Sequence, residues 1–500
     1  MTAAPGALID RIVMYSDRCR RIRDSRPGRE LLGLQVFRKT SRIDHSAQTV
    51  YDWHARPGAF QRLAPPWDAV RLVEHTGGIE NGARAVLELH IGPVPVTWVA
   101  EHRDNVPGRQ FTDVQVEGPF ARWEHAHRFE PIDDGASVLE DRIEYALPLE
   151  AVHSFISGGM VEARLQRGFG FRHRVTRRDL DLHARAGLEP GRRFVVSGAS
   201  GLLGSTLTEV LSTGGHEAWA LARAGSRSPL PTASAGSVAW DPASGTVDAA
   251  RLEGADYVVH LAGESIAGGR WSEERKAAIR DSRVQGTRLI AETLARLERP
   301  PEALICASAT GWYGDRGDER LDESSGPGEG FLSGVCREWE AAADAARKAG
   351  IRVVHLRFGM ILWPDGGALE RMLTPFMAGA GGRLGSGKQF WTWVSLDDAV
   401  GAVMHAASRR DLEGPVNVAA PEPIRNRDFT SVLGSVLNRP TVVPAPAPML
   451  RLALGEMADE LLLASSRVVP ERLSATAFPF RDPELEPALR HMLGRTEGDR

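Results

Sequence analysis

Two different hydrophobic patterns divide the chain near residue 190. Between residues 34 and 146, apolar and polar residues alternate in short runs, which is typical of antiparallel strands with one buried face. Turns rich in Gly, Pro and Asp separate these runs. The first part of the chain is therefore expected to form an antiparallel sheet. Its strands are expected at 36–43, 69–74, 83–91, 94–103, 109–117, 122–130 and 137–146.

Three helical stretches accompany these strands. Ser46 begins a capped helix with Val50 and Trp53 on one side, and a short helix broken by prolines follows at 57–67. A long helical stretch at 150–183 closes the unit. This order of elements, with the opening stretch from His45 to Trp67, resembles the helix-grip fold of the START/polyketide-cyclase-like (SRPBCC) superfamily. The resemblance covers about residues 34–185.

Members of that superfamily bind lipids, polyketides or other apolar molecules, so the resemblance implies an apolar ligand as one option here. The other option is that the aromatic side chains simply fill the core, and the sequence leaves both open. The aromatic residues concerned are Phe60, Trp67, Trp98, Phe111, Phe120 and Trp123.

Two histidines of the sixth strand are the candidates for metal binding. His125 and His127 alternate and so share one face, but no carboxylate or cysteine pattern joins them along the chain. Structural or surface histidines are therefore favoured over a metal site.

From Arg193 onward, apolar strands alternate with helical stretches, as in a parallel α/β sheet. Strands are expected at 193–197, 217–222, 237–240, 256–261, 303–308 and 352–357. Helices are expected at 202–213, 272–297 and 330–349, with a loop at 225–233. The fold class predicted for the second part is a doubly wound Rossmann fold, preceded by the α+β helix-grip domain.

The turn after the first parallel strand carries glycines at 198, 201 and 204. Gly198 lets the chain turn, Gly201 lets the backbone approach a pyrophosphate, and Gly204 lets helix and strand pack closely. The start of the following helix offers unpaired N–H groups to phosphate oxygens. The G-x-x-G-x-x-G spacing predicts a nucleotide site, and it lacks the Lys-Ser/Thr of a P-loop.

Further landmarks follow in order: 258–264, 308–315, 356–362, 391–400 and 414–419. Together they resemble an extended short-chain dehydrogenase/reductase, of the kind that includes NDP-sugar epimerases and dehydratases. The stretches LAGESIAGGRW, SATGWYGD and GGRLGSGKQFWTWVSLDD more closely resemble the YfcH-like epimerase family, sometimes labelled a SulA-type cell-division inhibitor. That resemblance covers about residues 193–492 and includes a C-terminal extension from about Pro444.

The resemblance implies NAD(P) as the cofactor. The residues expected to hold it are Gly198, Ser200, Gly201, Leu202, Leu203, Gly204, Leu261, Ala262, Gly263 and Ser308. A carboxylate at the end of the second strand would bind the ribose 2′-OH, whereas an arginine can pair with a 2′-phosphate. Arg223 stands there, with no Asp or Glu before Asp241. NADP is therefore favoured over NAD, an exposed loop arginine being the alternative.

Short-chain reductases normally use a Tyr-x-x-x-Lys pair, in which lysine and cofactor lower the pKa of the tyrosine. None of the five tyrosines of this chain is followed by lysine at the fourth position. Phe331 and Val335 are expected at the two places, and neither side chain ionises. Ser308 or Thr310 is the candidate for the Ser/Thr partner. Tyr313 is a candidate stand-in acid or a pocket wall.

Glu264, Arg270 and Trp271 follow the fourth parallel strand. They are candidates for lining a substrate site, with an exposed loop surface as the alternative. The domains expected are an extension (1–32), a helix-grip domain (33–186), a linker (187–192), a Rossmann domain (193–443) and a C-terminal extension (444–500).

Composition narrows the classes of function. The net charge of −4 gives no drive toward nucleic acid, and no apolar run reaches the ~20 residues that span a bilayer. Three distant cysteines predict a reducing, cytoplasmic location.

Three hypotheses about function remain: an NADP-dependent oxidoreductase or epimerase-like enzyme with a small-molecule substrate, a non-catalytic module that responds to dinucleotide, and an apolar-ligand carrier. The sequence leaves the oligomeric state open, although related folds often form a homodimer through a four-helix contact.

Overall fold

The computed structural model describes residues 33–68, 70–91, 94–148, 158–223 and 231–495. They form two compact units that do not follow the chain order. One contains the chain up to Ser41, Val70–Glu130 and Val138–Gln166, and the other contains Arg42–Ala69, Pro131–Ser137 and everything from Arg167. The polar extension expected at 1–32, the start of the long helix and most of the loop expected at 225–233 lie outside the described residues.

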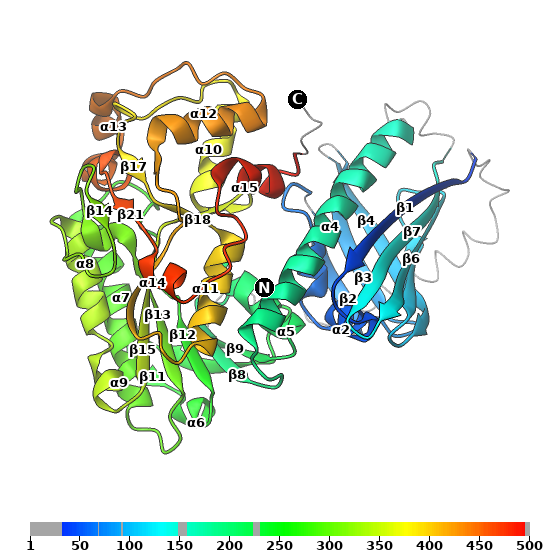
Figure 1. Cartoon of the computed structure of the whole chain (residues 1–500), viewed down its shortest axis with the longest axis horizontal. Coiled ribbons are helices and arrows are strands. Elements are labelled where there is room, and N and C mark those ends of the chain that lie inside the picture. The colour runs from blue at the N-terminus through cyan, green and yellow to red at the C-terminus, as the bar shows by residue number, and fades with distance from the viewer. Residues whose placement is uncertain (1–32, 69, 92–93, 149–157, 224–230, 496–500) are drawn as a thin grey trace, which may run out of the picture. The chain divides into compact units, whose positions relative to one another are not determined.

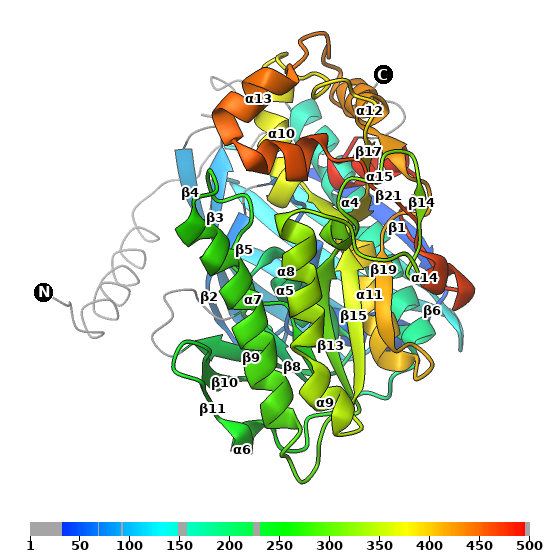
Figure 2. The same cartoon turned by 90° about the vertical axis from the view of Figure 1, so that its left-hand side faces the viewer.

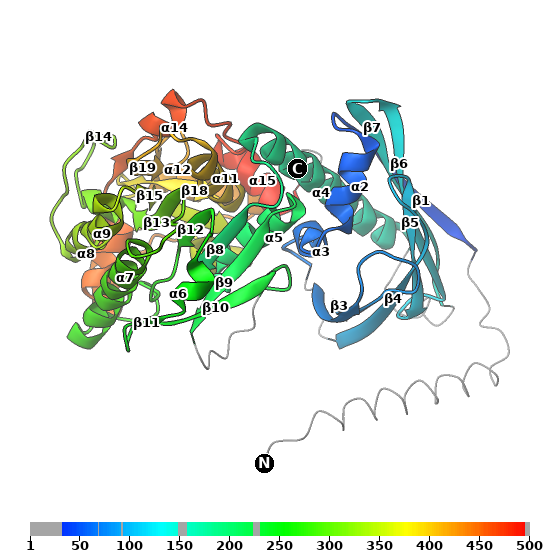
Figure 3. The same cartoon turned by 90° about the horizontal axis from the view of Figure 1, so that it is seen from below.

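The first part of the chain forms a seven-stranded sheet in the order β1-β7-β6-β5-β4-β3-β2 (Figure 3). Neighbouring strands from β2 to β6 are antiparallel, as the alternating pattern predicts. The strands are β1 (Gln35–Ile43), β2 (Val70–Thr76), β3 (Arg84–Ile91), β4 (Val94–Val106), β5 (Gln110–Glu117), β6 (Arg122–Asp133) and β7 (Ala136–Ala146).

Three helices interrupt or follow these strands: α2 (Ala47–Ala55), α3 (Ala59–Leu63) and α4 (Gly158–Ala186). The hydroxyl of Ser46 caps α2 by accepting from Thr49 N at 3.2 Å. Gly58 begins α3 with φ +94°, a conformation that favours glycine. The antiparallel sheet, the two short helices and the long helix after β7 make the predicted helix-grip arrangement.

The second part forms an eight-stranded sheet in the order β11-β10-β9-β8-β12-β13-β15-β19 (Figures 1 and 3). All neighbours are parallel except β10 and β11. The strand order reverses between β8 and β12, which is where a doubly wound sheet binds its ligand. The strands are β8 (Arg193–Ser197), β9 (Glu217–Arg223), β10 (Gly236–Asp241), β11 (Thr246–Val247), β12 (Tyr257–His260), β13 (Ala303–Ala309), β15 (Arg352–Phe358) and β19 (Gly414–Val418).

Alternate side chains of these strands enter two separate cores. Phe194 and Val196 pack with α5 (Leu202–Thr213) and α11 (Leu396–Ser408) on one face of the sheet. Val195 and its neighbours pack on the other face with α6 (Ala249–Leu252), α7 (Glu273–Leu294) and α9 (Asp344–Lys348). Figure 2 shows α7 and α8 (Phe331–Ala341) running side by side. The predicted Rossmann fold is confirmed, and the single helix expected at 330–349 is two helices, α8 and α9.

A third core lies beyond the carboxyl ends of the parallel strands, around Trp391, Trp393 and Phe429. The hydrophobic pattern did not assign the remaining elements of the second part of the chain, some of which pack into this core. They are η2 (Thr310–Tyr313), β14 (Arg320–Leu321), β16 (Met360–Trp363), α10 (Gly367–Met377), β17 (Phe390–Trp391), β18 (Trp393–Ser395), β20 (Ile424–Arg425), α12 (Asn426–Leu437), α13 (Ala447–Leu454), η3 (Ala458–Leu463), β21 (Arg467–Val468), α14 (Glu471–Ala475) and α15 (Leu485–Met492).

Within the described ranges, none of the helices combines the length and the apolar composition that crossing a bilayer requires.

Candidate dinucleotide and substrate site

The glycine turn after β8 is built for close backbone contacts. Gly198 has φ +69°, and a Cβ on it would lie 2.9 Å from the amide nitrogen of Ala262. A Cβ on Gly204 would overlap the carbonyl oxygen of Gly198, so helix α5 can start this close to β8 only without a side chain there. Gly201 is less constrained, because any residue can adopt its φ of −82° and a Cβ on it would meet Gly198 O at 3.3 Å.

The N-terminus of helix α5 is exposed to solvent at this turn. Gly201 is its N-cap and has no side chain that could cap the first N–H groups, and Ser200 and Gly201 are both exposed. The first N–H groups of a helix have no partner within the helix, and together with the helix dipole they attract phosphate. Leu202 and Leu203 supply these groups, as the sequence predicts for a pyrophosphate site.

A buried serine joins this turn to the end of β12. The hydroxyl of Ser197 accepts from Leu261 N at 3.0 Å and Ala262 N at 3.2 Å. It lies 2.6 Å from Nδ1 of His260, where a neutral imidazole can accept its hydrogen. Burial, with a smaller effect of Arg283, lowers the pKa of His260 to about 4 and keeps the ring neutral. Ser197 and His260 thus hold Leu261 and Ala262 beside the turn, a role that sequence reasoning missed because neither residue belongs to a glycine motif.

Two further cofactor candidates lie at the same edge of the sheet. Gly263 is exposed after β12, and Arg223 is exposed at the end of β9, where it pairs in register with Trp240 of β10. The residues that follow Arg223 lie outside the described part of the chain.

Ser308, near the end of β13, donates to Oε1 of Glu340 in α8 at 2.7 Å. Glu340 in turn accepts from Nε and Nη2 of Arg357 at 2.8 and 2.9 Å. Arg357 also lies over the ring of Trp312, 3.8 Å from its centroid. Because Ser308 donates its hydrogen to Glu340, its lone pairs are left to accept from a bound molecule. Glu340 and Arg357 were missed by sequence reasoning, since they match no short motif.

Tyr313 belongs to the same network and is fully buried. Its hydroxyl accepts from Arg357 Nη1 at 3.1 Å and lies 2.7 Å from Asn417 Oδ1 and 2.9 Å from Asp322 O. Burial raises the pKa of Tyr313 to about 12, although Arg357 acts in the opposite direction. These contacts bind η2 to the sheet. Thr310, three residues earlier, is half-buried.

The two residues expected at the usual Tyr and Lys places lie on α8. Val335 is buried, and Phe331 is half-buried at the start of the helix. The rings of Phe331 and Trp271 meet edge to face with centroids 5.1 Å apart. Glu460 of η3 caps this helix, accepting from Phe331 N at 2.7 Å and Leu332 N at 2.8 Å. The C-terminal extension thus reaches the start of α8.

The segment after Gly263 is tied to α7. Glu264 pairs with Arg275 at 2.9 Å, and Arg283 donates to the carbonyl oxygens of Glu264 and Ile279, both at 2.9 Å. A Cβ on Gly263 would lie 3.2 Å from Cζ of Arg283. Arg283 is therefore a cation at the edge of the candidate site that sequence reasoning did not single out. Arg270 lies beside Gly455 of the C-terminal extension.

Three family models match separate stretches of the chain. Residues 43–168 match polyketide cyclase / dehydrase and lipid transport. Residues 194–419 match the NAD dependent epimerase/dehydratase family. Residues 445–492 match a domain of unknown function, DUF1731.

Relatives of known sequence are similar to the second part of the chain. An epimerase family protein of Mycobacterium bovis is 40% identical over 294 residues, 59% of this chain and 95% of the relative. The human epimerase family protein SDR39U1 is 33% identical over 304 residues, 60% of this chain and 99% of the relative.

Two solved structures are also similar. The nucleoside-diphosphate sugar epimerase from Corynebacterium glutamicum has a TM-score of 0.74 and 31% identity, covering 92% of this chain and 90% of that one. The structure of human SDR39U1 with NADPH has a TM-score of 0.54 and 32% identity, covering 61% of this chain and 100% of that one.

Proposed function

The chain belongs to the NAD dependent epimerase/dehydratase family of extended short-chain dehydrogenases/reductases, and we propose that it is an NADP-dependent oxidoreductase or epimerase-like enzyme. The observation that carries the proposal is the open N-terminus of α5. Gly201, the N-cap of this helix, has backbone angles that any residue can adopt, and its position suits an approaching pyrophosphate. The closer resemblance to the YfcH-like members of this family rests on sequence motifs alone.

NADP is the dinucleotide proposed. Arg223 is exposed at the end of β9, where a ribose 2′-phosphate would lie, and the sequence has no Asp or Glu between it and Asp241 to bind a 2′-OH. The human relative SDR39U1 was solved with NADPH, which is a property of that protein and supports the same choice here. Arg223→Ala should weaken NADPH binding and leave NADH binding unchanged.

The chemistry proposed is hydride transfer without the usual acid. The chain contains no Tyr-x-x-x-Lys, and Phe331 and Val335 take those places in the proposal. General acid–base catalysis contributes about 10²–10⁴ in rate, so turnover should be slow rather than absent. Ser308 would accept a hydrogen bond from the substrate, and Thr310 would donate one. Trp271, with Glu264 and Arg270, would line the substrate side.

The test combines calorimetry with a kinetic assay on the full chain. Calorimetric titration with NADPH and NADH measures whether the glycine turn binds a dinucleotide. NADPH oxidation against a panel of carbonyl compounds then measures turnover. Binding together with turnover that Thr310→Ala abolishes supports the enzyme. Failure to bind either dinucleotide would refute the proposal.

A second candidate is a dinucleotide-responsive regulator, and the capping of α8 by Glu460 is the observation that favours it. Through this contact the C-terminal extension meets the start of α8, the helix that we propose carries the two substituted catalytic positions. Tight NADPH binding without turnover, together with slower amide hydrogen exchange in residues 444–495, would support this candidate. Unchanged exchange in those residues would count against it.

The third candidate is a carrier of an apolar molecule in the first part of the chain. Trp98 and Phe120 both contact the ring of Trp123, with centroids 4.9 and 4.7 Å away, and Tyr145 adjoins them. Such a group of aromatic rings suits either a core or the wall of a ligand site. Native mass spectrometry of gently purified protein would distinguish them by detecting a bound lipid.

A homodimer is also proposed. Helices α7 and α8, which related folds pair into a four-helix contact, lie side by side and enclose a groove of about 300 Å³ lined by Val284, Arg288 and Ala341, among others. Light scattering on the purified chain should give twice the mass of one chain, and a monomeric mass would refute the dimer.

A further inference from the structure

A row of polar side chains crosses the middle of the first sheet. His102 of β4 pairs in register with Asp113 of β5, and Asp113 pairs with His125 of β6. Residues directly opposite each other on neighbouring strands point to the same face of a sheet. His127, two residues after His125, shares that face and is buried. Three imidazoles and a carboxylate therefore gather at one point.

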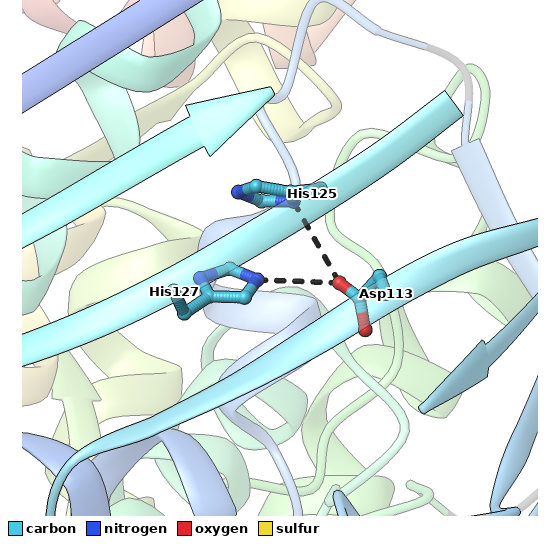
Figure 4. A group of neighbouring side chains, drawn as sticks. All are labelled: Asp113, His125 and His127. Carbon is cyan, nitrogen blue, oxygen red and sulfur yellow. Dashed lines mark hydrogen bonds and ion pairs between the residues drawn. The ribbon is translucent and has the colours of Figure 1, made fainter. Parts of the chain in front are cut away.

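The carboxylate of Asp113 faces one nitrogen of each β6 histidine (Figure 4). Its Oδ2 lies 3.2 Å from His127 Nε2 and 3.7 Å from His125 Nδ1. One ligand atom from each of the three residues lies within 4.8 Å of the others. In a tetrahedral site with metal–ligand bonds of about 2.0–2.2 Å, two ligand atoms are about 3.4 Å apart. The two distances at Asp113 bracket that separation.

Asp141 holds the opposite nitrogens of the same two rings. Its Oδ1 lies 2.8 Å from His125 Nε2 and 2.7 Å from His127 Nδ1. A carboxylate in this position fixes the tautomer of each imidazole and turns its lone pair toward the other side, where Asp113 lies. Histidines that bind metals almost always have such a partner on the second nitrogen.

Asp113 has a support of its own. His102 Nε2 lies 3.0 Å from Asp113 Oδ1, which leaves Oδ2 for the centre of the group. The ring of Phe111 stacks on His127 with centroids 4.2 Å apart, so an apolar wall adjoins the group. His102 and Asp141 thus position the three atoms that would bind a metal: Asp113 Oδ2, His125 Nδ1 and His127 Nε2.

The charges of the group also fit a dication. Asp141 and both β6 histidines are buried, with side chains no more than 8% exposed, and Asp113 is 24% exposed. Asp141 is buried and Asp113 is half-buried, which is costly for two carboxylates without compensation, and one divalent cation with neutral imidazoles would neutralise them.

We propose that Asp113, His125 and His127 bind a divalent transition-metal ion such as Zn²⁺, with Asp141 and His102 as positioning residues. Two imidazoles and one carboxylate are the ligand set of metal sites that keep an open position for water or for an oxygen of a small molecule. The proposal departs from the structural role favoured for His125 and His127 from the sequence. It is independent of the dinucleotide site.

The experiment measures metal content and affinity on the full chain. Protein stripped with a chelator and incubated with Zn²⁺ should retain about one zinc per chain after desalting, by mass spectrometry of the metal. Co²⁺ in place of zinc should give the visible absorption of a cobalt–imidazole site. A chain that holds no stoichiometric zinc and shows no such cobalt spectrum would overturn the proposal. Both measurements use the unmodified chain, so they decide even if a variant fails to fold.

Variants then assign the ligands. Asp113→Asn and His127→Gln should abolish stoichiometric binding, and Asp141→Asn should weaken zinc affinity by about 10–100-fold. His90→Gln, an exposed histidine at the end of β3, is the matched control and should bind zinc normally. Near-ultraviolet circular dichroism confirms that each variant is folded. Stoichiometric zinc that survives in folded His127→Gln would place the ion elsewhere and refute the site.

Discussion

Arg62 and Asp397 form a buried ion pair, with Nη2 and Oδ1 2.9 Å apart, although 335 positions separate them in the sequence. Arg62 lies on α3 and Asp397 on α11, and Asp179 of α4 accepts two further bonds from the same guanidinium at 2.8 and 2.9 Å. Burial alone would raise the pKa of Asp397, but Arg62, His491 and Arg481 hold it well below its usual range. One guanidinium thus bridges two buried carboxylates, and Nη1 of Arg481, a second cation, lies 3.6 Å from Asp179 Oδ1.

Replacing Arg62 by methionine should therefore lower the free energy of unfolding by about 3–5 kcal/mol, because Asp179 and Asp397 would stay buried without the guanidinium that bridges them. Urea unfolding followed by fluorescence measures the loss. Arg320→Met is the matched control, since Arg320 and Glu471 pair at 2.9 Å with both side chains more than half exposed. That pair should contribute at most about 1 kcal/mol. Equal losses in the two variants would contradict the prediction.

Glu209 of α5, near Arg62 and Asp179, should make stability fall as the pH rises. Burial raises the pKa of Glu209 from 4.5 to about 7, with Arg62 opposing and Asp179 adding to the shift. Between these two values the unfolded chain has lost the proton that the native chain keeps, so the native state loses up to about 3 kcal/mol. Glu209→Gln should unfold at higher urea than the wild type at about pH 8 and at a similar concentration near pH 4.5. Parallel pH profiles would show that Glu209 ionises normally.

Gly201→Ala should separate cofactor binding from folding. The new Cβ would lie 3.3 Å from Gly198 O, a tight contact that a small shift relieves, and φ needs no change. The methyl group would still stand where a pyrophosphate approaches, so NADPH affinity should fall at least about tenfold. Gly168→Ala in α4, with no atom within 4 Å of its Cβ, is the control and should bind NADPH normally. Calorimetry that gives equal affinities for both variants would argue against a phosphate at the turn.

Tyr313→Phe distinguishes a structural hydroxyl from a catalytic one. The variant should lose about 1–3 kcal/mol of stability, because Asn417 and Arg357 would lose a buried hydrogen-bond partner. NADPH affinity and any carbonyl turnover should stay within about twofold of the wild type. A fully stable variant that has lost turnover would instead identify Tyr313 as the stand-in acid.

The sequence predicted what local patterns encode. The glycines at 198, 201 and 204 specify a strand, a turn and a helix by themselves, and α5 begins and ends where the pattern predicts. The contacts of Asp113 with His125 and His127 depend on strand register, which the alternation of one strand cannot reveal. The same holds for Ser308 and Glu340, which meet only when α8 packs on β13. Whether Phe331 and Val335 replace the usual pair remains a prediction.

Most of α4, together with α2 and α3, belongs to the same compact unit as the parallel sheet, and this has a consequence for a shortened chain. Arg167 donates to the carbonyl oxygen of Gly494 at 2.8 Å, and Arg178 lies 3.1 Å from Asp482, so the N-terminal segment ties down the far end of the polypeptide. A polypeptide without the residues before the expected linker at 187–192 would keep Asp397 and Asp482 but lose Arg62 and Arg178, so we expect its second part to be less stable than in the full chain.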